Sequence, residues 1–352
     1  MTYSIADLAG ALGATFSGDG TVLVSGVAQP DVAGETDLAL AMDPKFATSI
    51  TSGSAQAAVL WEGADPSEFG LKAAIFAPRS RYALAGLTTK FYEPPALNDG
   101  IHETALIDPT AEVSSDARIG PFTVIGPNVR IGPGARIYAH VAIADNSIIG
   151  RDALIYSGVR IGQNVKIGDR FVAQIGAAIG ADGFSYVTPK PNSVEEAREQ
   201  GLVSSETQNN AFVRIESLAG VTLGDDVEFG ANSTIDRGTL IDTTIGRGTK
   251  VDNLVQIGHN VQIGEDCLLC GQAGIAGSAK LGDRIVLGGK AGVADHITIG
   301  SDVVVAGASA LSSNVPSGRI MMGNPAMRMD LNVESYKALR RLPRLLKKLS
   351  KG

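Results

Sequence analysis

The stretch VQIGHNVQIG, residues 255–264, contains the same Ile-Gly step twice, six residues apart. This six-residue spacing of aliphatic residues continues along much of the chain. A periodicity this long predicts a repeat architecture. It runs through two series: Ile107, Val113, Ile119, Ile125, Ile131, Ile137, Ile143, Ile149, Ile155, Ile161 and Ile167, then Ile245, Val251, Ile257, Ile263, Leu269, Ile275, Leu281, Leu287, Val293, Ile299, Val305 and Leu311.

Six residues accommodate one short strand and one turn. We expect each aliphatic side chain to point inward, and the residue after it to be small because the chain bends sharply there. Three such hexads would close a triangular coil of about 18 residues, and the coils would stack by parallel strand pairing about 4.8 Å apart. A narrow prism excludes large rings, which agrees with an aromatic content of 5%. A smaller inward side chain is expected two positions before each aliphatic, as at Ala117, Thr123, Val129, Ala135 and Val165.

The chain outside the repeat divides into separate regions. Residues 1–100 lack the periodicity and mix helical and strand-like segments, which predicts a compact α/β domain. The predicted β-helix spans 101–315, with a polar loop extruded at 187–211. Residues 316–352 form a C-terminal extension, in which 333–350 predict a basic amphipathic helix, bent or interrupted at Pro343. The fold class is therefore mainly β, a parallel β-helix with a small N-terminal α/β domain and a C-terminal helix.

Composition excludes several classes of protein. The net charge of −7 argues against a general nucleic-acid-binding protein. No stretch approaches the ~18 apolar residues of a membrane span, and the N-terminus does not resemble a signal peptide, so we expect a soluble, cytoplasmic protein. Cys267 and Cys270 are interpreted as small structural residues, because no second cysteine pair completes a zinc site. We therefore expect no metal and no cofactor.

His259 lies inside the repeat and has a predictable neighbour. Gly277 follows it by one coil of 18 residues, so the two should be vertical neighbours. A neutral imidazole is a general base, and a backbone N–H at a glycine stabilises an oxyanion. Together they favour acyl transfer, although a solvated turn histidine is the simpler alternative. Asp252 is either the group that orients His259, within its chain or from a neighbouring subunit, or a turn residue. His296 either contacts substrate or lies at a surface turn.

Three segments carry a resemblance to a known family. IGADGFSYV (179–187), FGANSTIDRGTLIDTTIG (229–246) and VDNLVQIGHNVQIG (251–264) resemble the UDP-3-O-(3-hydroxyacyl)glucosamine N-acyltransferases of lipid A biosynthesis. The resemblance covers nearly the whole chain and implies a left-handed β-helix. It implies transfer of a (3R)-3-hydroxyacyl group from acyl carrier protein to the 2-amino group of UDP-3-O-(3-hydroxyacyl)-glucosamine. The general base of the family falls on His259 and its oxyanion amide on Gly277.

The resemblance also implies that the N-terminal domain holds the uracil. The family uses a motif resembling Asn-Pro-Lys-Tyr after an aromatic residue, and this chain has LALAMDPKFA. Asp43 replaces the Asn, Phe46 replaces the Tyr, and Leu40 stands where an aromatic is common. Phe46 is expected to stack on the uracil, with Asp43 beside it.

Alternative functions and the oligomeric state complete the expectations. A sugar N-acetyltransferase that uses acetyl-CoA would have the same prism. A zinc carbonic anhydrase on this fold needs three convergent histidines, and His259 with His296 supplies two. A non-enzymatic scaffold is the third alternative. Since one convex prism offers little concavity for two large substrates, we expect a homotrimer with sites between subunits. The last sixteen residues, with seven Lys or Arg and no acid, predict a docking site for an acidic carrier protein.

Overall fold

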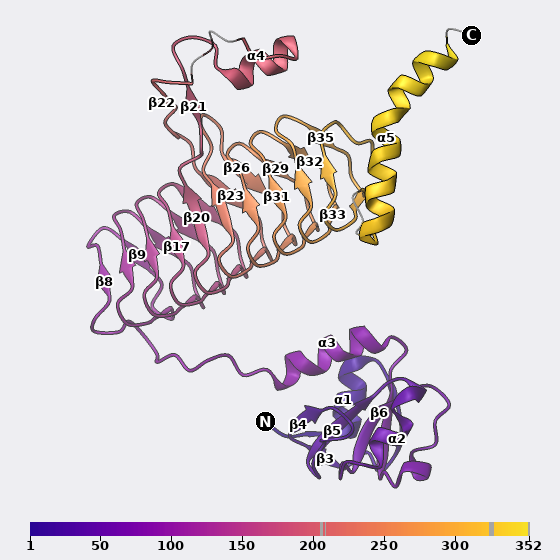
Figure 1. The fold of residues 1–352 in the computed structure, drawn as a ribbon. Coiled ribbons are helices and arrows are strands. Elements are labelled where there is room, and N and C mark those ends of the chain that lie inside the picture. The colour runs from indigo at the N-terminus through magenta and orange to yellow at the C-terminus, as the bar shows by residue number, and fades with distance from the viewer. Residues whose placement is uncertain (205–206, 208, 324–326, 351–352) are drawn as a thin grey trace. The chain divides into compact units, whose positions relative to one another are not determined.

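The computed structural model describes residues 1–204, 207, 209–323 and 327–350. The chain divides into a first unit, Met1–Ala96, and a second unit that begins at Leu97. Figure 1 shows the fold of each unit. No helix of the described residues is long and apolar enough to cross a membrane.

The first unit is built on a mixed sheet in the order β2-β7-β6-β5-β4. Along β6 (Ala57–Leu60), Ala57 and Val59 pack with one hydrophobic cluster, and Ala58 and Leu60 pack with a second cluster on the opposite face. Both faces of the sheet are therefore covered. The other elements are β1 Tyr3–Ser4, α1 Ile5–Leu12, β2 Thr15–Gly18, β3 Leu23–Val24, β4 Gly26–Ala28, β5 Asp37–Ala41, η1 Pro44–Phe46, α2 Ala47–Ile50, η2 Pro66–Phe69, β7 Ala73–Phe76 and α3 Ser80–Phe91.

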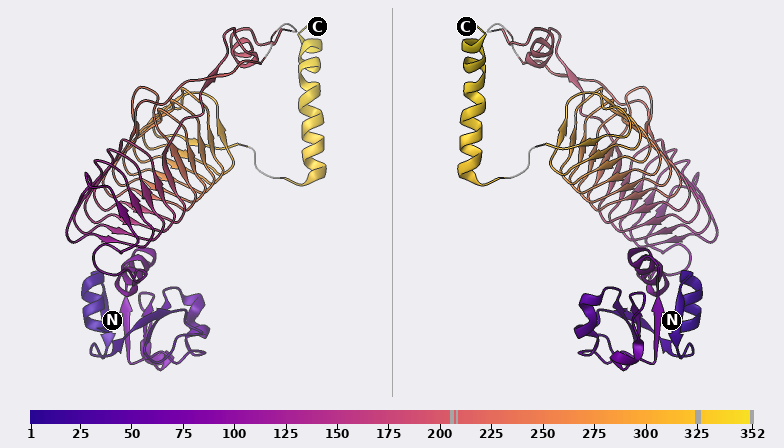
Figure 2. Two further views of the ribbon diagram at one scale, coloured as in Figure 1. Left: turned by 90° about the vertical axis from the view of Figure 1, so that its left-hand side faces the viewer. Right: turned by 90° about the vertical axis from the view of Figure 1, so that its right-hand side faces the viewer.

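The second unit is a parallel β-helix whose coils each contribute one strand to three sheets. The coils stack along the prism in both side views of Figure 2. The face that leads to His259 contains β8 Leu106–Ile107, β11 Val124–Ile125, β14 Ala142–Ile143, β17 Arg160–Ile161, β20 Ala178–Ala181, β25 Thr234–Asp236, β28 Gln256–Ile257, β31 Gly274–Ile275, β34 Gly292–Val293 and β37 Ala310–Leu311.

The two other faces follow the same stacking. One contains β10 Arg118–Ile119, β13 Arg136–Ile137, β16 Leu154–Ile155, β19 Val172–Ala173, β24 Glu228–Phe229, β27 Lys250–Val251, β30 Leu268–Leu269, β33 Val286–Leu287, β36 Val304–Val305 and β38 Ile320–Met321. The other contains β9 Glu112–Val113, β12 Arg130–Ile131, β15 Ile148–Ile149, β18 Val165–Ile167, β23 Val221–Leu223, β26 Thr243–Ile245, β29 Gln262–Ile263, β32 Lys280–Leu281 and β35 Thr298–Ile299. The last paired strand, β38, lies beyond the expected boundary at residue 315.

The interior of the prism matches the predicted pattern. The inward aliphatic residues form one continuous core, and the smaller inward residues Ala117, Thr123, Val129, Ala135 and Val165 are fully buried. Thr123 tolerates burial because its hydroxyl donates to the carbonyl of Tyr138 at 2.9 Å. Inward positions thus accept a polar side chain when a corner carbonyl lies within reach.

A glycine follows many of the inward aliphatic residues, and the structure requires it for a reason other than the one the sequence suggested. At Gly258 a Cβ atom would lie 2.9 Å from the amide nitrogen of Gly277, so the requirement is close approach to the next coil. The sharp left-handed bend falls two residues later, as at Asn260, with φ of 61°. Asn tolerates this conformation better than other side chains. The expectation that the bend explains the glycine was wrong.

The periodicity is hidden between the two series, but the coils continue there. Hydrogen bonds between equivalent residues of neighbouring coils span 18 residues at Arg151–Asp169, 56 residues at Asp169–Asp225 and 22 residues at Ala231–Asn253. Two insertions account for the longer separations. The first, called the arm here, is residues 182–220, and the second, called the corner loop, is residues 237–242. The stack is continuous through both.

The arm is more ordered than the predicted polar loop at 187–211. It leaves the prism after β20 and returns before β23 (Figure 1). Its base is a hairpin of β21 (Tyr186–Val187) and β22 (Val213–Arg214), and it carries helix α4 (Ser193–Gln200). Asn192 and Glu195 form a capping box at the start of α4. These contacts explain a helix in a segment with few apolar residues.

The C-terminal helix α5 spans Met329–Leu349 and runs through Pro343 without interruption. Of the two alternatives expected at Pro343, the interruption was wrong, and the bend stays a prediction. Every residue of α5 is exposed, including its leucines.

Candidate active site

His259 lies at the corner that follows β28, half-buried between two glycines. A Cβ atom on Gly277, one coil away, would lie 2.8 Å from Nε2 of the imidazole. On another side of the ring, a Cβ on Gly183 in the arm would lie 2.6 Å from Cβ of His259 and 2.9 Å from Cγ. The ring therefore occupies a slot that exists only because neither neighbour has a side chain.

Asn260 determines which ring nitrogen of His259 carries the proton. The Oδ1 atom of Asn260 accepts the backbone N–H of Thr239 at 2.8 Å, which identifies that atom as the acceptor oxygen. The same oxygen lies 3.1 Å from Nδ1 of His259, so Nδ1 donates. In the neutral imidazole the lone pair is then on Nε2, the nitrogen that faces Gly277. This is the tautomer that a general base at Nε2 requires.

Gly277 contributes backbone groups at the same corner. Its carbonyl accepts the N–H of His296 at 3.1 Å, and the N–H of Ser278 donates to the carbonyl of His259 at 2.9 Å. The N–H of Gly277 itself donates to none of the described residues. A backbone donor without a partner beside a basic nitrogen fits the chemistry of a developing oxyanion.

The other predicted residues of the prism lie differently around this corner. His296 lies one coil beyond Gly277 and is exposed. Asp252 is exposed, and its carboxylate accepts the N–H groups of Asn253 at 2.7 Å and Gly271 at 2.8 Å. Within one chain the partner of His259 Nδ1 is thus Asn260 and not Asp252. A contact from the Asp252 of a neighbouring subunit stays a prediction.

Asp236 is a group near the imidazole to which the sequence reasoning gave no role. Burial raises the pKa of its carboxyl, and the charge of Asp182 raises it further, while a hydrogen bond from Gln256 and the positive charge of His259 oppose the shift. Asp236 therefore lies within electrostatic reach of His259. Asp236 lies in the segment 229–246 quoted above. The corner loop lengthens the separation between its coil and the next to 22 residues, and this places Asp236 beside the coil of His259.

The arm and the prism together enclose a hollow of about 840 Å³ that includes His259 and His296. Apolar side chains of the arm form much of its lining: Phe184, Tyr186, Val187, Val194 and Phe212. Arg198 of α4 ties the arm to the prism through an ion pair of 2.7 Å with Asp295. A single chain thus has more concavity beside His259 than the convex prism alone would offer.

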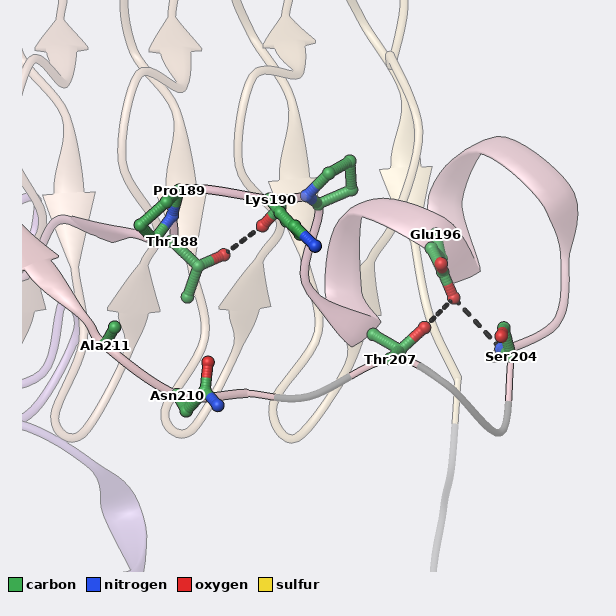
Figure 3. Close-up of a pocket in the computed structure, with 9 residues that line it drawn as sticks. Thr188, Pro189, Lys190, Glu196, Ser204, Thr207, Asn210 and Ala211 are labelled. Atoms are coloured by element: carbon green, nitrogen blue, oxygen red, sulfur yellow. Dashed lines mark hydrogen bonds between the residues drawn. The ribbon is translucent and has the colours of Figure 1, made fainter.

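A second hollow of about 570 Å³ lies within the arm and includes neither histidine. Figure 3 shows its lining, in which the carboxylate of Glu196 accepts hydrogen bonds from the Thr207 hydroxyl and the Ser204 N–H. These bonds lower the pKa of Glu196. They fix the turn after α4, so this hollow belongs to the internal structure of the arm.

The two predicted uracil-binding residues lie in the first unit. Asp43 caps η1 by accepting the N–H of Lys45 at 3.0 Å and also pairs with its ammonium group at 3.3 Å. Phe46 is half-buried against one of the two hydrophobic clusters, and Lys45 Nζ lies 5.1 Å from its ring centre. One face of the Phe46 ring is thus occupied by a cation.

The cysteines point to different environments. Cys267 is buried, its thiol donates to the carbonyl of Gly282 at 3.3 Å, and burial raises its pKa. Cys270 is only partly buried. Among the described residues no group of three or more His, Cys, Asp or Glu is placed to hold a metal ion.

Comparisons with known proteins agree with this fold. Residues 101–183 match the family model described as the GMPPB C-terminal domain, 217–253 match the hexapeptide repeat of succinyl-transferase, and 242–277 match the bacterial transferase hexapeptide. A crystal structure titled for the UDP-N-acetylglucosamine acyltransferase of Arabidopsis aligns with a TM-score of 0.52 at 20% identity, covering 63% of this chain and 71% of that one. The prism is therefore the left-handed β-helix of the hexapeptide acyltransferases, as the resemblance implied.

Two curated relatives define the family more narrowly. The UDP-3-O-acylglucosamine N-acyltransferase of Ruegeria pomeroyi is 55% identical over 99% of this chain and 96% of its own length. The protein of the same name from Paracoccus denitrificans is 57% identical over 98% and 94%. This chain belongs to the UDP-3-O-acylglucosamine N-acyltransferases. It is an acyltransferase, which excludes the carbonic anhydrase and the non-enzymatic scaffold.

Gly277→Ala should impair catalysis far more than folding. The new methyl group would collide with Nε2 of His259, so the imidazole must leave its slot. We expect turnover to fall by at least about a hundredfold, the lower range for loss of a general base, with little change in the denaturation midpoint. Gly10→Ala is the control, because a Cβ atom added at this exposed position of α1 would meet nothing within 4 Å. Equal activity of the two variants would contradict the slot.

Asp236→Asn should stabilise the protein at neutral pH. A carboxyl whose folded pKa is raised binds its proton more tightly in the folded state, so the stability of the folded state falls as pH rises through that pKa. The amide removes this penalty, so the melting temperature should rise at pH 7 and match the wild type near about pH 3, below the usual Asp pKa. Asp302→Asn is the control of opposite sign, since a hydrogen bond and charge from Arg284 lower the pKa of Asp302. A Tm difference for Asp236→Asn that does not vary with pH would contradict the assignment.

Proposed function

We propose that this acyltransferase moves a (3R)-3-hydroxyacyl group from acyl carrier protein to the 2-amino group of UDP-3-O-(3-hydroxyacyl)-glucosamine, in lipid A biosynthesis, with His259 as general base. The observation that carries the proposal is the orientation of the His259 ring. Its Nδ1 is tied to Asn260, and its Nε2 lies beside Gly277, whose N–H donates to none of the described residues. The names of the relatives support the acceptor.

The proposed reaction uses both groups of this corner. The acceptor amine attacks the carbonyl carbon of the donor thioester, and Nε2 of His259 takes the proton that the amine loses. The carbonyl oxygen becomes an oxyanion that accepts the N–H of Gly277. Collapse of the intermediate forms the amide and expels the carrier thiolate, which takes the proton from the imidazolium. The carboxylate of Asp236 lies within electrostatic reach of this imidazole.

The acetyl-CoA alternative has less support. The hollow beside His259 has an apolar lining of five arm residues, which suits a long acyl chain better than an acetyl group. The closely similar relatives are likewise named for an acylated UDP-sugar.

A homotrimer remains part of the proposal. The outward positions on the face of β31 are small along much of its length, as at Ala142, Ala178, Gly274, Gly292 and Ala310. Two shallow hollows on this face are lined mainly by apolar atoms. A flat, weakly polar face of this kind suits contact with a second prism, which would add walls to the site.

The first unit is proposed to hold the uridine part of the acceptor, with uracil stacked on Phe46. The ring is half-buried, so part of it is accessible for such a contact. Asp43 already caps η1 and pairs with Lys45, so its part in uracil binding would be indirect, through the conformation of this turn.

His259→Ala tests the proposed base. The variant should lose at least about a hundredfold in kcat and keep the KM for both substrates, because the imidazole acts on the proton and not on binding. His140→Asn is a matched histidine control, since His140 stacks on Phe122 at a distant corner and Asn tolerates its left-handed backbone. Measuring acyl transfer by mass spectrometry, we would abandon the role if His259→Ala kept more than a third of wild-type turnover.

The basic tail tests the proposed donor. Helix α5 presents Lys337, Arg340, Arg341, Arg344, Lys347 and Lys348 with exposed leucines between them, and Lys351 lies outside the described residues. An acidic carrier would be steered by these charges in a salt-dependent way. Removing residues 337–352 should lower kcat/KM for acyl carrier protein and remove most of its salt dependence. Turnover of an uncharged acyl-pantetheine should be unchanged, and an equal loss with both donors would refute steering.

A further inference from the structure

The N–H of Gly277 donates to none of the described residues, although the next coil supplies a residue that caps this group at other corners. Gly277 is the second residue after an inward aliphatic, Ile275, at the end of β31. Backbone N–H groups at this place point along the stack toward the next coil. Whether such an N–H finds a hydrogen-bond acceptor depends on the side chain that the next coil supplies at this place.

Aspartates of the next coil cap this N–H at three other corners. The pairs are Arg151 N–H on Asp169 at 2.8 Å, Asp169 N–H on Asp225 at 2.8 Å and Glu265 N–H on Asp283 at 2.9 Å. In each pair the acceptor is the residue one coil further on. A carboxylate at this place is thus positioned to accept the N–H of the coil before it, in a charge-assisted hydrogen bond.

The residue one coil after Gly277 is also an aspartate, Asp295. The pairing of β31 with β34 puts Ile275 beside Val293, so Gly277 and Asp295 are equivalent residues of neighbouring coils. By the pattern of the other corners, Asp295 should cap the N–H of Gly277. Asp295 accepts no hydrogen bond from Gly277 among the described residues, and its Oδ2 accepts Arg198 of the arm at 2.7 Å. Asp169 also pairs with an arginine, but with the side chain of Arg151, the residue whose N–H it caps, so that pairing holds the carboxylate at the amide. Arg198, by contrast, comes from outside the stack.

We propose that Arg198 is a positioning residue that keeps the oxyanion donor of this enzyme available by holding the carboxylate of Asp295 away from the N–H of Gly277. This inference rests on the proposed role of Gly277. Without Arg198, Asp295 caps the amide as its counterparts do. The oxyanion then has to displace a carboxylate of like charge, so the transition state loses its donor and gains a repulsion.

The pairing also connects the arm to the chemistry. Arg198 lies on α4. Val194, one turn earlier on the same helix, lines the hollow beside His259. An ion pair with 62% of the Arg side chain and 35% of the Asp side chain exposed contributes little to stability. Its effect is therefore expected on the amide and not on the fold. The arm can release and restore the donor at small cost.

The test is a double-variant cycle on the full-length enzyme, read as kcat and KM for N-acyl transfer. Arg198→Ala should lower kcat about tenfold, less than the roughly 10²–10³ expected when an oxyanion donor is lost outright, because the cap is in equilibrium with the free carboxylate. Arg198→Ala combined with Asp295→Ala should recover most of the lost kcat, since no carboxylate remains to cap Gly277. Arg198→Lys should keep more activity than Arg198→Ala. Glu199→Ala, the next exposed residue on α4, is the matched control.

The outcomes separate this role from a purely structural one. If Arg198 only fastens the arm, the double variant is as slow as Arg198→Ala, Asp295→Ala is equally slow, and KM rises in all three. Any of these results, or an Arg198→Ala variant with wild-type kcat, overturns the proposal. Failure of the underlying function is recognised independently, because His259→Ala would then keep its activity and the wild type would not use the proposed substrates.

Discussion

Parallel backbone pairing between coils is the constraint on which the rest of this structure depends. Each coil repeats its strands above the last, so two residues one coil apart are held about 4.8 Å from each other whatever lies between them in sequence. Ile257 pairs with Ile275, and this pairing alone puts His259 over Gly277. The active-site geometry is therefore carried by backbone hydrogen bonds and a continuous aliphatic core. Neither is sensitive to the chemistry at the corner.

The site itself is built where the regular repeat is broken. The corner loop supplies the N–H of Thr239 that fixes the amide of Asn260, and the arm supplies Gly183, which closes the slot around the imidazole. Without these insertions His259 would be a turn residue like His140, with no partner to select its tautomer. Regular coils thus fix the distance between His259 and Gly277, the proposed base and oxyanion donor, and the two insertions add the contacts that orient the imidazole.

The same distinction explains what the sequence could predict. The prism, its inward residues and the neighbourhood of His259 and Gly277 follow from a repeat of 18 residues and needed no three-dimensional information. Asp236 and Gly183 were missed because their contacts with His259 cross separations altered by an insertion, where counting along the chain fails. Asn260 is adjacent to His259, but the orientation of its amide depends on Thr239 in the corner loop. The partner of Nδ1 was assigned to Asp252 as a possibility. That carboxylate instead caps a neighbouring turn, a use common in this stack.

Polar side chains at the corners compete for the same backbone groups that catalysis needs. A stacked coil leaves an N–H at many of its corners, and at three of them an aspartate in the next coil satisfies it, which stabilises the fold and removes the donor. At Gly277 the donor has to remain free, so any carboxylate in the next coil needs another partner. Arg198 provides that partner from a segment that is not part of the stack. The rigid prism can then keep a regular sequence of corner residues, while the arm decides whether one of those corners is available for reaction.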